Sequence, residues 1–360
     1  MNGNAMVHAL GQSLWLDNIT RDILNNGTLQ KYIDTLSVTG LTSNPSIFQK
    51  AIAGTSSYDE QIRSLMGGGL DTEELFFELA LSDLTQAADL FTSIHASTAG
   101  VDGFVSLEVS PLLANDTPDT IEQAKILHGK ANRPNLFIKV PGTEEGLPAI
   151  EELIFAGIPI NVTLLFSREQ YMAAAEAYTR GIERRIEAGL DPKVESVASV
   201  FISRWDKAAS GTLTGDLKDA LGMAIGRRTY ASYVDFINGE RWTALKEKGA
   251  RPQRLLWAST GTKDPALPDS YYVTGLAAPE TVNTMPEKTL LSMESVTEVD
   301  GPMATDGGDC EAVLSRIADA GIDVMALAQK LQIDGRDSFN DSWHAMIKDI
   351  ASKTASMAGA

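Results

Sequence analysis

The alternation of short apolar runs with longer helix-like segments constrains the fold of this chain more than any other feature. Eight runs are rich in apolar and β-branched residues and are bounded by turn residues, as is typical of buried strands. They span residues 13–17, 37–44, 103–109, 135–141, 158–166, 194–203, 254–260 and 271–276. Strands that alternate with helices predict a parallel sheet, because each parallel neighbour needs a crossover connection.

The segments between the runs have the signatures of helices. In the clearest one, Ser167 is placed as an N-terminal cap and Gly189 as a stop, and Pro118 lies near the first turn of another. Residues 45–100 predict two or three helices inserted before the third strand, and the chain after residue 276 is predicted to be helical.

Eight parallel strands in 360 residues without a linker favour a (β/α)8 TIM barrel with inserted and C-terminal helices. We expect a single domain over residues 1–360. An open doubly wound sheet is the alternative, but no glycine-rich dinucleotide turn follows an early strand.

Charge and composition exclude several function classes. The net charge of −18 argues against general binding to nucleic acid or to an anionic membrane, because both need a basic face. Four scattered histidines show no paired-ligand spacing, so we expect no metal, and Cys310 is the only cysteine. With neither an apolar run near 18 residues nor a leader pattern, we expect a cytoplasmic protein.

Polar side chains gather towards the carboxyl ends of the predicted strands, where barrel strands are otherwise apolar. Separately, each has a structural explanation: Asp17 as a helix cap, Asn44 as a brace before Pro45, Glu108 as an ion-pair partner of Lys139. Together they favour an active site, because TIM-barrel enzymes build their sites at this end. The candidates are Asp17, Asn44, Glu108, Lys139, Asn161, Thr163, Ser199, Phe201, Arg204, Ser259 and Lys263.

Lys139 is the most informative of these residues, because it interrupts the apolar run 135–141. Burying an ammonium is costly unless it is paired or loses its proton, and a neutral amine attacks ketones. The resulting iminium draws electrons from a neighbouring carbon–carbon bond, and carboxylates such as Asp17 and Glu108 suit the proton transfers. The residues therefore predict class I aldol chemistry.

Seven segments resemble the signature motifs of transaldolases and occur along this chain in the same order as in that family. The resemblance runs from about residue 12 to the last helices, and the long trailing region resembles a bacterial subgroup that some species fuse to a glucose-phosphate isomerase. It implies a barrel of the class I aldolase type. The segments are "WLDNITRD", "GLTSNPSIF", "VSLEVSP", "NLFIKVPGT", "INVTLLFS", "VASVFISRWD" and "LLWASTGTKDP".

The resemblance also implies roles for the catalytic residues. Lys139 would form the Schiff base, and Asp17 would take the hydroxyl proton during carbon–carbon cleavage. Glu108 and Thr163 would activate the water that moves protons at the carbinolamine. The reaction would transfer dihydroxyacetone from sedoheptulose 7-phosphate to glyceraldehyde 3-phosphate, without metal or organic cofactor, in the pentose phosphate pathway.

The remaining candidates would bind these sugar-phosphate substrates. Asn44, Asn161 and Ser199 would bind the dihydroxyacetone unit, and Arg204 would hold the phosphate. Shorter transaldolases have a second arginine where this chain has Gly261, and our hypothesis is that Lys263, with Ser259 nearby, replaces it.

Two other functions compete with transfer. A fructose 6-phosphate aldolase would release dihydroxyacetone instead of transferring it. Those enzymes resemble transaldolases, but they have a tyrosine near the catalytic water where this chain has Phe201, and an apolar ring there favours transfer. A catalytically silent sugar-phosphate-binding barrel would not need a buried amine. The sequence leaves open whether the chain is a homodimer or a monomer.

Overall fold

The computed structural model describes residues 1–358 and contains a closed barrel of eight parallel strands, each paired with the next and β8 with β1. This confirms the (β/α)8 prediction. The strands are β1 (Ser13–Asp17), β2 (Val38–Thr42), β3 (Val105–Glu108), β4 (Leu136–Pro141), β5 (Ile160–Leu165), β6 (Ser196–Phe201), β7 (Arg254–Ala258) and β8 (Thr281–Met285).

Seven of these strands lie within the predicted runs, but the predicted strand at 271–276 is wrong. Residues Tyr271–Gly275 form helix α14, and the eighth strand is Thr281–Met285. A short apolar run does not distinguish a buried helical turn from a strand by periodicity alone. In β8 the polar Asn283 is fully buried and its side chain accepts a hydrogen bond from Thr260, so the strand lacks an apolar pattern.

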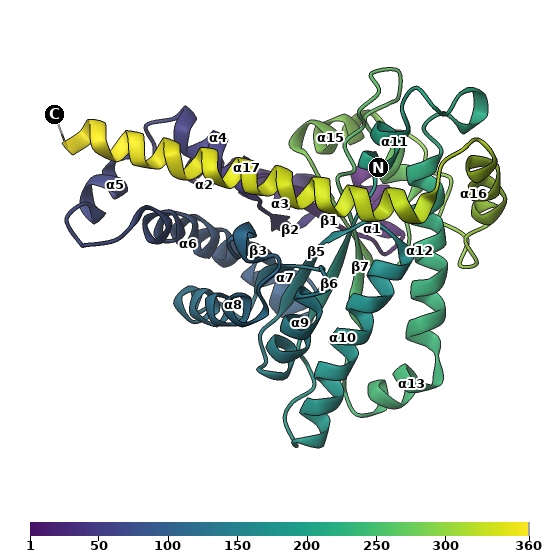
Figure 1. The fold of residues 1–360 in the computed structure, drawn as a ribbon, viewed down its shortest axis with the longest axis horizontal. Coiled ribbons are helices and arrows are strands. Elements are labelled where there is room, and N and C mark those ends of the chain that lie inside the picture. Colours follow the sequence, from purple (N-terminus) through teal and green to yellow (C-terminus); the bar gives the residue numbers. More distant parts are fainter. Residues whose placement is uncertain (359–360) are drawn as a thin grey trace.

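Helices connect the consecutive strands and surround the barrel, and further helices follow β8 (Figure 1). Four of them occupy the insertion between β2 and β3, one more than the upper prediction. The α-helices are α1 (Gly3–Ala9), α2 (Arg21–Asn25), α3 (Thr28–Thr35), α4 (Pro45–Gly54), α5 (Asp59–Leu65), α6 (Thr72–Leu90), α7 (Thr92–Ser97), α8 (Thr117–Ala131), α9 (Gly146–Phe155), α10 (Arg168–Glu187), α11 (Ser203–Ala209), α12 (Leu221–Asn238), α13 (Glu240–Glu247), α14 (Tyr271–Gly275), α15 (Glu287–Ser292), α16 (Cys310–Asp319) and α17 (Val324–Ala358). The 3₁₀ turns are η1 (Pro111–Leu113), η2 (Gly215–Leu217) and η3 (Met293–Ser295).

Ser167 caps α10 as predicted, but Asp17 does not cap the helix that follows β1. Ser167 caps α10 and forms a reciprocal capping box with Gln170. The cap of α2, the first helix after β1, is Thr20, whose side chain accepts a hydrogen bond from the backbone of Ile23. Asp17 is therefore free for another role.

The barrel interior is filled by a packed apolar layer beneath the carboxyl ends of the strands. Phe104 stacks on Phe137 with ring centroids 4.0 Å apart, and Trp15 lies 6.1 Å from Phe137. Val197, Leu256 and Val282 belong to the same buried cluster. Since this apolar layer fills the barrel interior, the polar side chains at the strand ends line a closed-ended pocket and not a channel through the barrel.

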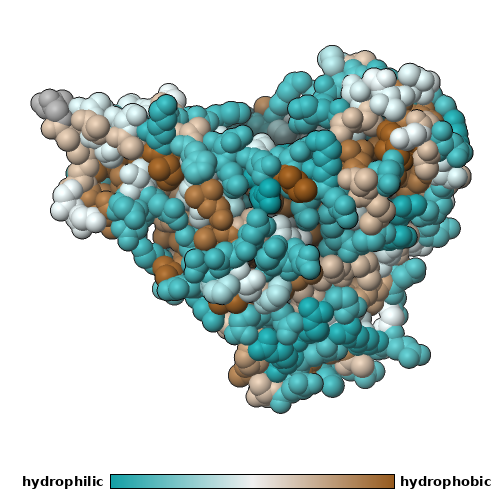
Figure 2. All heavy atoms as spheres, viewed as in Figure 1, coloured by the Kyte–Doolittle hydropathy of each residue, from teal (hydrophilic) through white to brown (hydrophobic). Residues whose placement is uncertain are grey.

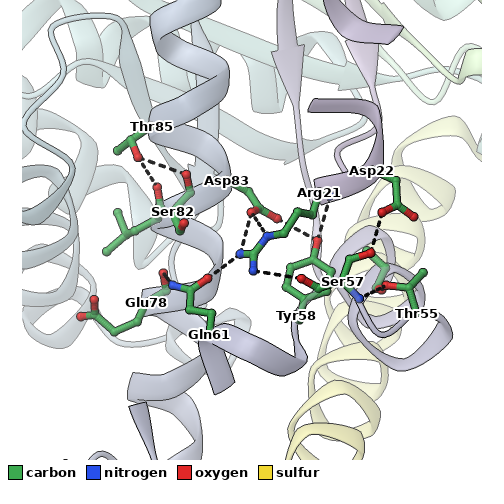
Figure 3. Close-up of polar contacts among 12 residues, drawn as sticks. Arg21, Asp22, Thr55, Ser57, Tyr58, Gln61, Glu78, Ser82, Asp83 and Thr85 are labelled. Atoms are coloured by element: carbon green, nitrogen blue, oxygen red, sulfur yellow. Dashed lines mark hydrogen bonds and ion pairs between the residues drawn. The ribbon is translucent and has the colours of Figure 1, made fainter. Parts of the chain in front are cut away.

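The insertion is fixed to the barrel by a buried polar network (Figure 3). Arg21, which begins α2, donates from Nε to Asp83 of α6 at 2.9 Å and from Nη2 to Gln61 of α5 at 2.6 Å. The Tyr58 hydroxyl donates to the other oxygen of Asp83 at 2.7 Å. This network (Arg21, Tyr58, Gln61 and Asp83) links the segment after β1 to two inserted helices.

The long helix α17 runs across the molecule from the barrel to the inserted helices (Figure 1). It packs against α4, and Lys353 donates to the backbone oxygens of Ile52 and Thr55. Over residues 1–358, none of the helices combines the length and apolar character needed to cross a membrane. The face in Figure 2 is mainly hydrophilic, interrupted by separate hydrophobic patches.

Candidate active site

Lys139 and Glu108 meet in the barrel mouth because their strands are in register. Glu108 of β3 pairs with Lys139 of β4, and the exposed fractions of the two side chains are 7% and 6%. Lys139 Nζ lies 3.2 Å from Glu108 Oε2 and donates to the backbone oxygen of Ser43 at 3.2 Å. The buried amine is thus held by a carboxylate and by the chain just beyond β2.

Two carboxyl groups share this mouth, and burial raises the pKa of both. For Asp17, burial outweighs the opposing charge of Lys139 and the hydrogen bond from Thr42. For Glu108, burial outweighs Lys139, and the negative charge of Asp17 raises the pKa further. The raised pKa means that each carboxyl group holds a proton more readily than an exposed one does, which suits groups that take up and return protons.

Asp17 is oriented by two threonines that the sequence analysis did not identify. Thr42 Oγ1 donates to Asp17 Oδ1 at 2.8 Å, and its hydroxyl lies 2.6 Å from that of Thr284. Both threonines are at the ends of their strands, β2 and β8, which flank β1. A threonine at a strand end is common, so its type alone gave no signal.

Two buried oxygen atoms near Lys139 have no hydrogen-bond partner. They are Thr163 Oγ1 and Glu108 Oε2, which is in ion-pair contact with Lys139 Nζ at 3.2 Å but accepts no well-aligned hydrogen bond. Thr163 is fully buried and belongs to β5, which is the neighbour of β4. Because buried polar groups are normally paired, two unpaired oxygens at one site indicate a place for a polar ligand or water.

Asn161 and Ser199 form a polar layer between the apolar floor and the mouth. Asn161 Nδ2 donates to Ser106 Oγ at 3.1 Å, and Ser199 Oγ donates to Asn161 Oδ1 at 2.7 Å. Asn161 is fully buried, so part of its amide is committed within the barrel. Asn44 also has a structural task, since its Oδ1 caps α4 by accepting from the backbone of Ile47, which leaves its amide group free.

Two cations lie at one side of the mouth without a carboxylate partner. No carboxylate among residues 1–358 lies within 4.0 Å of Arg204 or Lys263. The guanidinium of Arg204 lies 5.2 Å from the Phe201 ring centroid, and burial lowers its pKa. The pKa of Lys263 is also lowered, mainly by partial desolvation and to a lesser extent by the positive charges of Arg204 and Lys207. The residue as a whole is nevertheless exposed.

A cavity of about 130 Å³ joins the amine to these cations. Of the predicted site residues, Glu108 and Asn161 are not part of its lining. Phe339 of α17 lines the cavity and was missed, since helix packing brings it from a distant part of the sequence. The lining consists of Asp17, Thr42, Asn44, Lys139, Thr163, Ser199, Phe201, Arg204, Ala258, Ser259, Gly261, Lys263, Thr284, Pro286 and Phe339.

Comparison with known proteins identifies the family. The family model for transaldolase/fructose-6-phosphate aldolase matches residues 14–350. The chain belongs to this family. A transaldolase from Parafrankia sp. is 42% identical over 97% of this chain and 97% of its own length. A transaldolase from Mycolicibacterium paratuberculosis is 43% identical over 98% and 97%, and one from Acidothermus cellulolyticus is 44% identical over 94% and 93%.

Family membership confirms the resemblance drawn from the sequence and places the chain among transferases of the transaldolase type.

Gly261, which replaces the arginine of shorter transaldolases, lies close to Pro286 at the start of α15. A Cβ atom at this position would lie 3.1 Å from Cγ of Pro286, so any larger side chain would press on the start of α15. Nearby, Ser259 has a positive φ of 54° and its hydroxyl lies 3.0 Å from that of Ser203. Among residues 1–358 there is no cluster of side chains suited to hold a metal ion.

Proposed function

We propose that this chain is a transaldolase that transfers dihydroxyacetone from sedoheptulose 7-phosphate to glyceraldehyde 3-phosphate. The products are erythrose 4-phosphate and fructose 6-phosphate. The observation that carries the proposal is the buried amine of Lys139, 3.2 Å from Glu108 in the mouth of a barrel of this family. No metal or organic cofactor takes part in the proposed reaction.

In the first step, the neutral amine of Lys139 adds to the ketone carbon C2 of the donor and forms a carbinolamine. A proton then reaches the carbinolamine oxygen, water leaves, and the iminium forms. We assign this proton transfer to Glu108 acting through a water held with Thr163. The raised pKa of Glu108 and the unpaired oxygens of both residues support the assignment.

In the second step, Asp17 accepts the proton of the donor C4 hydroxyl while the C3–C4 bond breaks. The bonding electrons move onto C3 and neutralise the iminium, which leaves an enamine on Lys139 and releases erythrose 4-phosphate. The hydrogen bond from Thr42 supports this role because it orients the Asp17 carboxylate. The enamine then attacks the acceptor aldehyde, and Asp17 returns the proton to the new hydroxyl.

Substrate binding divides between the two sides of the cavity. Asn44 and Ser199, with Asn161 hydrogen-bonded behind Ser199, would bind the hydroxyls of the dihydroxyacetone unit. Arg204 and Lys263 would bind the phosphate, with Ser259 assisting. Unpaired cations lining one cavity in a chain of net charge −18 support a local anion site. Lys263 would supply the charge that shorter transaldolases obtain from an arginine at the position of Gly261.

We assign the chain to the long bacterial subgroup, as one domain that acts in the cytoplasm within the pentose phosphate pathway. Phe201, a buried phenylalanine lining the cavity, favours transfer over simple release of dihydroxyacetone. Size-exclusion chromatography would distinguish a homodimer from a monomer.

Trapping with borohydride in the presence of fructose 6-phosphate tests the proposal. We expect a stable adduct of dihydroxyacetone on Lys139, located by peptide mapping. Adding glyceraldehyde 3-phosphate with sedoheptulose 7-phosphate should yield fructose 6-phosphate. Adduct formation at Lys125 or Lys263 instead would contradict the lysine assignment, and release of dihydroxyacetone without transfer would identify an aldolase.

A further inference from the structure

Phe339 connects the two chemical ends of the cavity although it comes from the C-terminal helix. Its side chain is 5% exposed and lines the cavity. The ring centroid lies 5.7 Å from Lys139 Nζ and 5.9 Å from Arg204 Cζ. It also lies 6.5 Å from the ring centroid of Phe201, so the two rings form an apolar wall (Phe201 and Phe339).

The position of this wall is fixed by contacts one and two turns earlier in α17. Gln332 Nε2 donates to the backbone oxygens of Gly142 at 3.1 Å and Leu164 at 2.9 Å, next to the ends of β4 and β5. At Gly335, a Cβ atom would lie 3.1 Å from Cδ2 of Leu164 and 3.4 Å from Nη1 of Arg204. The helix backbone therefore approaches the barrel closely, and Phe339 lies in the lining of the cavity. Figure 1 shows α17 crossing the barrel.

This position matters because the enamine has two possible fates. Its carbon C3 can attack the acceptor aldehyde, which forms the new carbon–carbon bond and completes transfer. Alternatively, C3 takes a proton from water, which regenerates the iminium. A water molecule then adds to C2, the bond between C2 and the lysine nitrogen breaks, and free dihydroxyacetone leaves with the amine of Lys139 restored.

We propose that Phe339 is a specificity-determining residue that favours transfer by keeping water away from the enamine carbon. This inference rests on the proposed function. Carbon C3 is two bonds from Lys139 Nζ, so the enamine forms in the cavity that Phe339 lines, with the ring centroid 5.7 Å from Nζ. Excluding water from a closed site suppresses hydrolysis of reactive intermediates. The residue acts together with Phe201, but its location on α17 makes the C-terminal helix part of the site.

The test compares the ratio of dihydroxyacetone released to product transferred in wild type, Phe339→Leu and Phe339→Ala. We expect the ratio to rise in that order, by about tenfold for the alanine variant, which corresponds to about 1.4 kcal/mol between the competing barriers. If the alanine variant does not fold, the leucine variant still decides, because it keeps an apolar side chain but leaves part of the wall open.

Met346→Ala is the matched control, because Met346 is fully buried on α17 but is not part of the cavity lining. Its ratio should equal that of the wild type even if its melting temperature falls. An unchanged ratio in both Phe339 variants would overturn the inference, and so would an equal rise in Met346→Ala. A wild-type chain that traps no adduct would instead overturn the proposed function, and the inference with it.

Discussion

Two buried ion pairs in this molecule have nearly the same burial but different surroundings. In the network of Figure 3, Arg21 and Asp83 have exposed fractions of 12% and 1%, and in the mouth Lys139 and Glu108 have 6% and 7%. Asp83 accepts from Arg21 and Tyr58, and Arg21 donates also to Gln61. By contrast, Glu108 Oε2 is in ion-pair contact with Lys139 Nζ at 3.2 Å but accepts no well-aligned hydrogen bond.

The difference separates a pair that holds the fold together from a pair that has chemistry to perform. Burial raises the pKa of Asp83 as it does that of Glu108, so a raised carboxyl pKa does not distinguish them. Hydrogen-bond satisfaction does, because a group that must exchange protons with substrate keeps bonding capacity free. We therefore expect substitutions in the first pair to affect stability and those in the second to affect rate.

The largest effect is expected for Lys139→Arg. A guanidinium keeps its proton and does not attack a ketone, so adduct formation and transfer should both be abolished. Mass spectrometry after borohydride trapping measures the loss. Lys125→Arg, at a half-exposed lysine on α8, is the control and should retain full activity. Residual Schiff-base formation in Lys139→Arg would mean that another lysine carries the reaction.

Asp17→Asn should leave the first step intact and slow the second. Asparagine still accepts the hydrogen bond from Thr42 but takes no proton from the donor hydroxyl. General bases contribute about 10²–10⁴-fold, so cleavage from the preformed adduct should fall by this factor. Rapid-quench measurement of erythrose 4-phosphate release, with trapping yield as the control, checks this. Cleavage at the wild-type rate would leave Asp17 with only a structural role.

Asp83→Ala and Glu108→Gln together test whether the first pair acts on stability and the second on rate. Removing one partner of a satisfied buried pair typically costs about 3–5 kcal/mol, so Asp83→Ala should lower the free energy of unfolding by this amount. Glu108→Gln keeps a polar side chain of the same size beside Lys139, so it should lower stability less than Asp83→Ala does, while slowing adduct formation. Urea unfolding and trapping kinetics measure the two effects, and the reverse pattern would refute our distinction.

The pH dependence of cleavage should reflect the raised pKa of Asp17. The carboxylate accepts a proton only when ionised, so the rate falls as pH drops through its pKa. Burial raises that pKa above the ordinary value of 3.8, so the acid limb should lie above 3.8 and be absent from Asp17→Asn. Single-turnover rates across pH, with circular dichroism to confirm folding, give the limb. A limb at or below 3.8 would contradict the assigned base.

The sequence was sufficient for seven of the eight strands and for the position of Lys139 within an apolar strand, because both depend on local patterns. A lysine inside an apolar run and polar residues at strand ends are visible without coordinates. Phe339 was not predictable, since its place depends on how α17 packs across residues far away in the chain. Nor was the Ser43 carbonyl that receives the bond from Lys139, because every residue has a carbonyl and only the fold selects one.

The smallest effect is expected for Lys263→Ala, which tests whether the two cations beside the mouth act together. Arg204 is half-buried against Phe201, whereas Lys263 is exposed, so Lys263 should contribute less to phosphate binding. We expect the KM for phosphorylated acceptors to rise roughly threefold to tenfold, a loss of about 0.6–1.4 kcal/mol, with kcat unchanged. Reactions of unphosphorylated acceptors should be unaffected.

Lys207→Ala is the control for this last variant, because Lys207 is also exposed and its removal changes the net charge equally, but it does not line the cavity. A local phosphate contact predicts a rise in KM for Lys263→Ala alone, whereas a general electrostatic effect predicts equal rises that vanish as salt screens the charges. Equal losses with both acceptor types would exclude phosphate binding by Lys263. Phosphate binding would then be assigned to Arg204 alone.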